Sequence, residues 1–238
     1  MFVSESFYTV QGEGKRLGTP SYFLRLAGCN LHCGFDVKDL PYITQSNLES
    51  YKKGNWICDT VGVWKSGKKI NDPSSFLREE WERYKYTNLV ITGGEPLMQT
   101  EDLREMLTKI TDWYRGTVEV ETNGTLSPSR IKTFVNNFNV SPKLYLGKNF
   151  QINKDWYNMY DSFVIWKFVV SSKEDVEKVV NWSKNQSINS DMIYLMPASE
   201  NREQLIGKSK EVVEWSKEFG FNMTTRLQIL IWDKLTGV

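Results

Sequence analysis

Three cysteines lie in the first quarter of this 238-residue chain, at positions 29, 33 and 58. An odd number of clustered thiols does not make a disulfide framework, so we interpret Cys29, Cys33 and Cys58 as ligands. Three thiolates can bind three irons of a [4Fe–4S] cluster and leave the fourth iron open for an exchangeable ligand. A zinc site completed by His32 is the alternative, although His32 adjoins Cys33 and ligation by both neighbours at once would be awkward.

Polar segments follow several of the predicted strands. Thr92-Gly93-Gly94-Glu95-Pro96 comes directly after an apolar run, and residues 119–124 and 141–143 occupy equivalent places. Two glycines allow the backbone to approach a ligand closely, and the Glu95 carboxylate can accept hydrogen bonds from an ammonium group. Because ligands of open α/β sheets bind at the carboxyl ends of the strands, we expect these segments to share one face.

Apolar strands and amphipathic helices must position these groups. We predict strands over residues 21–26, 88–92, 117–121, 163–170 and 192–195, and one that ends before residue 141. We predict helices that begin at residues 72–73, 127–128 and near 173, one that carries Leu103, Met106, Leu107 and Ile110, and one that ends near residue 220. Strands separated by helices of about ten to fifteen residues indicate parallel βαβ units. The chain is thus predicted to be a single α/β domain over residues 1–238, an incomplete TIM-type barrel of about six βα units.

The composition argues against several functional classes. Thirty Lys and Arg residues balance 29 Asp and Glu residues, so the net charge of +1 gives no bias toward nucleic acid or membranes. Residues 1–5 lack the basic and apolar regions of a signal peptide, and no apolar run approaches the roughly 20 residues that span a bilayer. We therefore expect a soluble cytoplasmic protein without a nucleic-acid or membrane partner.

The order of these motifs resembles that of the radical S-adenosylmethionine superfamily. The cysteines follow Arg25-Leu26-Ala27-Gly28, and Thr-Gly-Gly-Glu-Pro follows one strand later. Within that superfamily the chain resembles the 7-carboxy-7-deazaguanine synthase family over most of its length. The corresponding segments are residues 7–14, 58–60, 63–65, 121–124, 141–143, 167–170 and 226–228.

One departure from the superfamily concerns the cysteine spacing. The usual pattern is CxxxCxxC, but the third position after Cys33 is Asp36. We interpret residues 34–57 as an insertion between the second and third ligands, because a carboxylate is a harder ligand than a thiolate and suits iron–sulfur clusters poorly. Cys58-Asp59-Thr60 also matches the family, whereas the residues after Asp36 do not. The alternative makes Asp36 a ligand and Cys58 incidental.

The resemblance implies an activity and its cofactors. Members of the family convert 6-carboxy-5,6,7,8-tetrahydropterin to 7-carboxy-7-deazaguanine with loss of ammonia, in the biosynthesis of queuosine and related 7-deazapurines. A [4Fe–4S] cluster, S-adenosylmethionine and Mg²⁺ take part, and a 5′-deoxyadenosyl radical abstracts hydrogen from the pterin. A homodimer and an electron donor such as flavodoxin or ferredoxin are also implied. The cofactors carry the chemistry, and no further catalytic residue is implied.

The resemblance also implies a role for particular residues. Cys29, Cys33 and Cys58 ligate the cluster, and Thr60 ligates Mg²⁺. The residues implied to bind S-adenosylmethionine are Gly94, Glu95, Ser141, Pro142, Lys143, Met196, Pro197, Ala198 and Ser199. The residues implied to bind the pterin are Val10, Gln11, Gly12, Arg25, Thr92 and Val238. The planar guanidinium of Arg25 suits a substrate carboxylate.

Three other interpretations remain open, and one of them is a decayed paralogue whose long insertion binds another molecule. A radical S-adenosylmethionine activase that makes a glycyl radical on a partner protein would share the cysteines and Gly-Gly-Glu-Pro. A non-enzymatic, zinc-stabilised interaction module would share only the cysteines.

Overall fold

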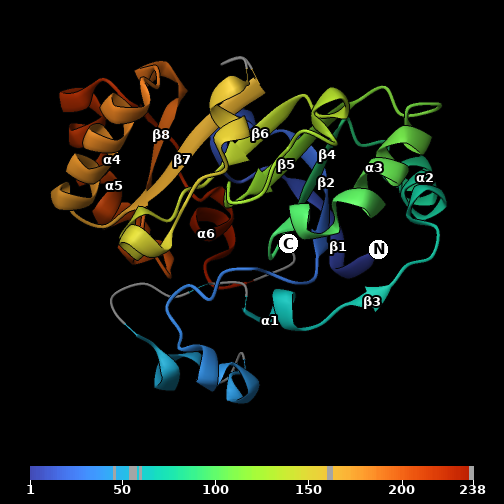
Figure 1. Ribbon diagram of the computed structural model, residues 1–238, viewed down its shortest axis with the longest axis horizontal. Coiled ribbons are helices and arrows are strands. Elements are labelled where there is room, and N and C mark those ends of the chain that lie inside the picture. The colour runs from blue at the N-terminus through green and yellow to red at the C-terminus, as the bar shows by residue number, and fades with distance from the viewer. Residues whose placement is uncertain (45–46, 54–57, 59–60, 160–162, 236–238) are drawn as a thin grey trace.

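The computed structural model describes residues 1–44, 47–53, 58, 61–159 and 163–235. Their strands form one sheet in the order β3-β1-β2-β4-β5-β6-β7-β8-β9 (Figure 1). The strands are β1 (Phe2–Val10), β2 (Pro20–Leu26), β3 (Lys68–Lys69), β4 (Asn88–Gly93), β5 (Thr117–Thr122), β6 (Asn137–Val140), β7 (Val164–Val170), β8 (Ile193–Pro197) and β9 (Asn222–Met223). β1 is antiparallel to both of its neighbours, and every pairing from β2 to β9 is parallel. The fold is therefore a mixed α/β fold.

The helices of the described residues lie mostly in the connections between parallel strands, whereas β5 and β6 are connected without an α-helix. The helices are α1 (Val61–Lys65), α2 (Pro73–Tyr84), α3 (Thr100–Ile110), α4 (Lys173–Gln186), α5 (Arg202–Phe219) and α6 (Leu227–Trp232). The predicted start of α2 is confirmed, because the Asp72 side chain accepts a hydrogen bond from the Ser75 amide at 3.2 Å and Pro73 opens the first turn. α5 ends on Gly220, whose positive φ of 68° closes the helix in the left-handed region. Within the described ranges, no helix combines the length and the apolar character needed to cross a membrane.

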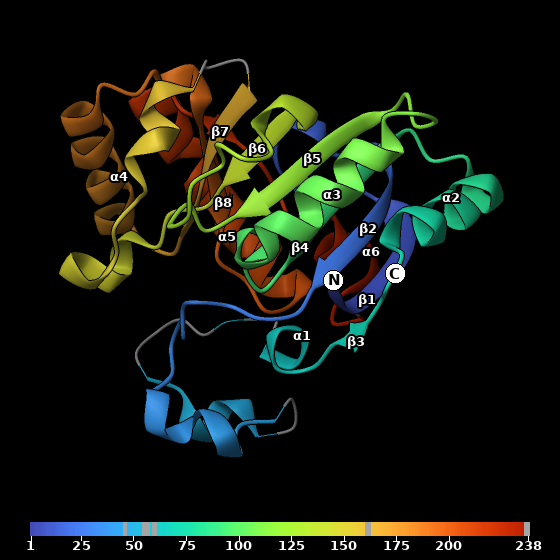
Figure 2. The ribbon, with the colours of Figure 1, turned by 45° about the vertical axis from the view of Figure 1, so that its right-hand side comes forward.

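The two faces of the sheet differ in character. Successive side chains of a strand point to opposite faces. On one face, Leu24, Ile91, Val120 and Phe138 are buried in the main core, where the helices cover the sheet (Figure 2). The opposite face carries several buried polar side chains, although parallel strands covered on both faces are usually apolar throughout. These side chains include Thr92, Glu119, Asn139 and Lys167. Buried polar side chains at the ends of parallel strands make this polar face the candidate for function.

The sheet curves around its polar face. The Gly14 amide, beyond β1, donates a hydrogen bond to Thr224 Oγ1 beyond β9 at 2.7 Å. The Leu227 amide donates to the Gly12 carbonyl at 2.9 Å. The chain segments after β1 and after β9 therefore meet, while the described end strands β3 and β9 each pair with only one neighbour.

The helix predicted to begin at Ser127-Pro128 is wrong. Residues 132–134 form a 3-10 turn, and Asn137–Val140 are strand β6 between β5 and β7. Ile131, Val135 and Phe138 are buried and Phe134 is half-buried, because a turn followed by a strand can bury side chains that also happen to lie at helical spacing. The Val118 amide of β5 donates to Asn136 Oδ1 at 2.8 Å and helps to fix this register.

The segment between the second and third cysteines is not structureless. It contains two 3-10 helices, η2 (Val37–Tyr42) and η3 (Leu48–Tyr51), and projects from the body of the molecule (Figure 2). Phe35 and Ile43 are buried there together with Val61 in a small core separate from the main one. This segment thus has packing of its own.

Candidate active site

The cysteine loop follows β2. The Cys58 amide donates a hydrogen bond to the Cys33 carbonyl at 3.1 Å, so the third cysteine lies beside the second. The pKa of the Cys29 thiol is raised to about 12, mainly by burial. A hydrogen bond from the Leu31 amide lowers this pKa, whereas the charges of Glu95, Cys33 and Cys58 raise it. Within the described ranges, no three Cys, His, Asp or Glu side chains converge closely enough to bind one metal ion in common. A cubane cluster instead takes each thiolate at a different iron, and three thiols in one loop region that form no disulfide fit that group.

The loop after β4 lies directly on the cysteine loop. The Gly94 amide donates to the Leu26 carbonyl at 3.0 Å, and the Glu95 amide donates to the Gly28 carbonyl at 2.8 Å. Gly93 has a φ of 130°, and a Cβ atom added there would lie 2.1 Å from the Leu26 carbonyl oxygen. Only glycine allows this contact between the ends of β2 and β4.

The Glu95 carboxylate is completely buried. It accepts hydrogen bonds from the Leu97 amide at 3.0 Å, Thr122 Oγ1 at 2.8 Å and the Asn123 amide at 2.7 Å. Burial raises the pKa of Glu95 to about 6, and these hydrogen bonds oppose the rise. Glu95 therefore joins the loop after β4 to the loop after β5, and its predicted contact with S-adenosylmethionine would use its remaining acceptor capacity.

The loop after β5 also reaches the cysteine loop. Asn123 Nδ2 donates to Asn30 Oδ1 at 3.0 Å, and Asn30 Nδ2 donates to Thr125 Oγ1 at 2.7 Å. Next to it, the Ser141 amide donates to the Thr122 carbonyl at 2.8 Å. The carboxyl ends of β2, β4, β5 and β6 therefore meet at one edge of the sheet, as the sequence predicts.

Two more predicted segments extend this edge. Lys143 Nζ donates to Ser141 Oγ at 3.2 Å, and Pro142 between them is buried. Met196, Pro197 and Ser199 are buried at the end of β8, while Ala198 is half-buried. The Ala198 amide donates to the Val170 carbonyl at 2.9 Å, which places this segment beside the end of β7.

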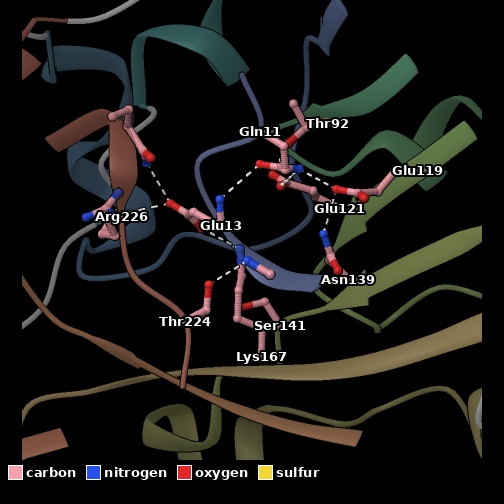
Figure 3. Close-up of polar contacts among 12 residues, drawn as sticks. Gln11, Glu13, Thr92, Glu119, Glu121, Asn139, Ser141, Lys167, Thr224 and Arg226 are labelled. Carbon is pink, nitrogen blue, oxygen red and sulfur yellow. Dashed lines mark hydrogen bonds and ion pairs between the residues drawn. The ribbon is translucent and has the colours of Figure 1, made fainter. Parts of the chain in front are cut away.

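A cluster of carboxylates and amides lies on the polar face (Figure 3). Gln11 Nε2 donates to Glu119 Oε1, and also to Glu121 Oε1 at 3.2 Å. Thr92 Oγ1 donates to Glu121 Oε2 at 3.0 Å, and Asn139 Nδ2 donates to Glu119 Oε1 at 2.8 Å. We call Gln11, Thr92, Glu119, Glu121 and Asn139 the carboxylate cluster. It joins residues of four separate segments beside the strand ends.

Glu119 has the most perturbed environment in the carboxylate cluster. Burial, followed by the charge of Glu121, raises the pKa of Glu119 to about 7. Its Oε2 atom is buried and has no hydrogen-bond partner among the described residues. Such an oxygen can accept a hydrogen bond from an N–H or O–H group of a ligand.

Glu13 forms a second hub next to the carboxylate cluster (Figure 3). Its carboxylate accepts hydrogen bonds from Lys167 Nζ at 2.5 Å, Gln228 Nε2 at 2.8 Å and Arg226 Nε at 3.3 Å. Burial would raise the pKa of Glu13, but Lys167 and Arg226 outweigh it and lower the pKa to about 2. The Glu13 amide donates to Gln11 Oε1 at 3.1 Å, which turns the amino group of Gln11 toward Glu119 and Glu121.

Of the other residues predicted to bind the pterin, Arg25 pairs with Thr92 across β2 and β4, and Val10 and Gly12 flank Gln11 in the sequence. Arg25 Nε is 3.1 Å from Glu5 Oε1, and the guanidinium lies 5.3 Å from the centre of the Phe7 ring. Val10 is half-buried, and a Cβ atom at Gly12 would lie 1.9 Å from Gln228 Oε1. The N-terminal segment is thus pressed against the C-terminal one.

Three further residues of the sequence analysis are Thr60, Val238 and Asp36. Thr60 and Val238 lie outside the described residues. Asp36, the alternative cluster ligand, is exposed, with Oδ2 3.9 Å from Lys53 Nζ.

Seven residues of the two hubs had no predicted role: Glu13, Glu119, Glu121, Asn139, Lys167, Arg226 and Gln228. The sequence signal that could have identified such residues is the presence of acidic and amide residues at alternate positions of buried strands. A charged side chain is seldom buried without a partner.

Comparisons with known proteins agree with this geometry. A family model described as a 4Fe-4S single cluster domain matches residues 10–189. The crystal structure of QueE from Escherichia coli matches with a TM-score of 0.63 over 94% of this chain and 92% of that chain, at 19% identity. This likeness shows the shared fold.

Two curated relatives match over nearly their whole length. The 7-carboxy-7-deazaguanine synthase of Pyrobaculum aerophilum is 30% identical over 99% of this chain and 96% of its own. The enzyme of the same name from Clostridium acetobutylicum is 29% identical over 97% of this chain and 96% of its own. With the cysteine loop, the Gly-Gly-Glu-Pro loop and the carboxylate cluster gathered at one sheet edge, the chain belongs to the 7-carboxy-7-deazaguanine synthase family.

Proposed function

We propose that this chain converts 6-carboxy-5,6,7,8-tetrahydropterin to 7-carboxy-7-deazaguanine with loss of ammonia. The observation that carries the proposal is the meeting of three groups at the carboxyl ends of β2, β4, β5 and β6: the cysteine loop, the Glu95 loop and the carboxylate cluster. The first two suit a cluster and its cofactor, and the third suits a substrate rich in N–H groups. The product would enter 7-deazapurine biosynthesis.

Cys29, Cys33 and Cys58 would hold the [4Fe–4S] cluster. Thiolates must form when iron binds, and the raised pKa of Cys29 means that its thiol remains protonated near neutral pH without a cation beside it. A cluster with one open iron and S-adenosylmethionine supplies one-electron radical chemistry when both are bound. The chain's own residues position the reactants and exclude water.

The cofactor residues would lie along the same edge of the sheet. Gly94 and Glu95 would meet the methionine end of S-adenosylmethionine, since their amides already fix this loop to the cysteine loop. Ser141, Pro142 and Lys143 would contact it further along, and residues 196–199 would border its adenosine. Each loop is held by a neighbouring strand end, so the contacts are preorganised.

The pterin would lie over the polar face. Its ring carries N–H donors that match the carboxylates of Glu119 and Glu121, and the buried, unpartnered Glu119 Oε2 offers an acceptor. Gln11 and Thr92 orient these carboxylates through their hydrogen bonds. Arg25 would bind the substrate carboxylate with the guanidinium nitrogens that do not face Glu5.

The finer features follow from the same family membership. The curved sheet would form an incomplete TIM-type barrel within a single domain. Residues 34–57 would be an insertion in the cluster loop. Thr60 would ligate Mg²⁺, a hard cation that prefers oxygen, and Val238 would reach the substrate. A flavodoxin or ferredoxin would deliver the electron, and the enzyme would act as a cytoplasmic homodimer.

An anaerobic assay tests the proposal. The reconstituted protein is incubated with S-adenosylmethionine, the carboxy-tetrahydropterin, Mg²⁺ and dithionite, and 5′-deoxyadenosine and 7-carboxy-7-deazaguanine are quantified. We expect both products to accumulate together. Formation of 5′-deoxyadenosine without the deazaguanine acid would contradict the proposed substrate and favour a radical activase. A colourless protein with stoichiometric zinc would contradict an enzymatic function and favour the zinc-stabilised interaction module.

A further inference from the structure

The chain between the second and third cysteines returns to its starting point. The Lys53 amide donates to the Gly34 carbonyl at 2.8 Å, and the Cys58 amide donates to the Cys33 carbonyl at 3.1 Å. Lys53 therefore lies beside Gly34, and Cys58 lies beside Cys33. In a CxxC spacing, the short covalent connection itself keeps two thiols together, but in this chain contacts across the insertion must do so.

The small core supplies such contacts. Ile43, Phe35 and Val61 are only 1%, 7% and 0% exposed. Cys58 packs against this core together with Leu40 and Tyr51, and the core is separate from the main one. The third thiol therefore rests on apolar side chains that come from both sides of it in the sequence.

Lys65 adds a polar connection. Its Nζ atom donates hydrogen bonds to the Leu40 carbonyl at 2.6 Å and to the Ile43 carbonyl at 2.5 Å. Lys65 ends α1, the helix that begins three residues after Cys58. The insertion before Cys58 and the helix after it are thus held to each other.

We propose that the insertion positions Cys58, with Phe35, Ile43 and Lys65 as positioning residues for the third cluster ligand. The inference rests on the proposed function, in which Cys58 ligates the cluster. Tightly packed interiors fix side chains because they contain few voids, and a deletion that opens a cavity loosens its neighbours. Loss of the small core would therefore free Cys58 from the cluster while the main core remains folded.

The test compares Ile43→Ala with two control variants. Each protein is reconstituted anaerobically, and we measure iron and sulfide per chain, the electron paramagnetic resonance spectrum of the reduced cluster, and the rate of iron loss to a chelator. We expect Ile43→Ala to lose iron at least about tenfold faster and to show an altered spectrum. Ile43→Leu, which refills the core, should remain within about twofold of the unchanged protein.

Leu107→Ala is the matched control, because Leu107 is also fully buried but lies in the main core on α3. It should lower the unfolding temperature without a change in the rate of iron loss. Lys65→Met keeps the small core but removes the two hydrogen bonds of Lys65 Nζ. It should accelerate iron loss less than Ile43→Ala does. If Ile43→Ala does not fold, Lys65→Met decides the question.

Two different results would contradict two different parts of the account. Iron loss and spectra unchanged in both Ile43→Ala and Lys65→Met would overturn the positioning role of the insertion. Full cluster content in Cys58→Ala would instead overturn the proposed ligand set. Neither result depends on which substrate the enzyme uses.

Discussion

Lys167 of β7 donates a hydrogen bond to Glu13 at 2.5 Å across 154 positions of sequence. The side chains of Lys167 and Glu13 are only 7% and 14% exposed. Because Arg226 and Gln228 bind the same carboxylate, Glu13 connects the segment after β1, the middle of the sheet and the segment after β9. This hub holds the curved sheet together beside the proposed substrate.

Glu13→Gln should destabilise the protein by about 3–5 kcal/mol, because it removes the carboxylate charge that both Lys167 and Arg226 contact. Urea denaturation of the apoprotein measures the change. Adding Lys167→Met to Glu13→Gln should recover part of the loss, because one of the two cations that contact Glu13 is then absent.

An exposed ion pair provides the control for that prediction. Lys173 Nζ lies 2.6 Å from Glu218 Oε1, but both side chains are about half exposed to solvent. Glu218→Gln should therefore cost less than about 1 kcal/mol. Equal losses in Glu13→Gln and Glu218→Gln would contradict the role of the hub.

Glu119 should make apoprotein stability depend on pH in a defined window. Its pKa is about 7 in the folded protein against an ordinary value of 4.5, so the folded state binds the proton more tightly. The resulting stability is complete below pH 4.5 and is lost as the pH rises through 7. A loss on the order of 3 kcal/mol is expected, since each tenfold change in proton affinity is worth about 1.4 kcal/mol.

Glu119→Gln should remove this component of the pH dependence. Free energies of unfolding measured at pH 4.5 and pH 8 for the parent and the variant give the difference directly. Glu13 titrates in the opposite sense and in another window, because its folded pKa of about 2 means that its contribution is lost as the pH falls from 4.5 through 2. An identical pH profile for parent and variant above pH 4.5 would refute the assignment to Glu119.

Gly93→Ala should destabilise the protein by at least about 3 kcal/mol, because it combines backbone strain with a steric clash. The new Cβ would lie 2.1 Å from the Leu26 carbonyl oxygen in a backbone conformation with a φ of 130°. Gly207→Ala in α5 is the matched control, since no atom lies within 4 Å of its added Cβ. That variant should be stabilised by about 0.5–1 kcal/mol. Thermal unfolding of both variants compares their stabilities. A Gly93→Ala protein as stable as the parent would contradict the predicted clash with Leu26.

Local sequence patterns predicted most of the parallel sheet. The strand predicted over residues 88–92 is β4 (Asn88–Gly93), and the one predicted over residues 117–121 is β5 (Thr117–Thr122). Apolar and β-branched residues bounded by turn signals carry this information locally. β1 was not predicted as a strand. It pairs antiparallel with β2, and a βαβ pattern predicts only parallel strands.

The carboxylate cluster could be predicted only in part. Gln11 and Thr92 were recognised through their motifs, and residues 119–124 as a polar strand end. The contacts of Gln11 with Glu119 and of Lys167 with Glu13 span 108 and 154 positions, respectively. They exist because the sheet curves, and curvature is a property of the assembled strands rather than of any local pattern.

The most direct test of the central claim compares Cys58→Ala with Asp36→Ala in anaerobically reconstituted protein. We measure iron and sulfide per chain and the electron paramagnetic resonance signal of the reduced cluster. Cys58→Ala should lose the [4Fe–4S] cluster, because only two thiolates then remain, while Asp36→Ala should keep it. A cluster that survives in Cys58→Ala and disappears in Asp36→Ala would show that the third ligand is the carboxylate and would contradict ligation by three cysteines.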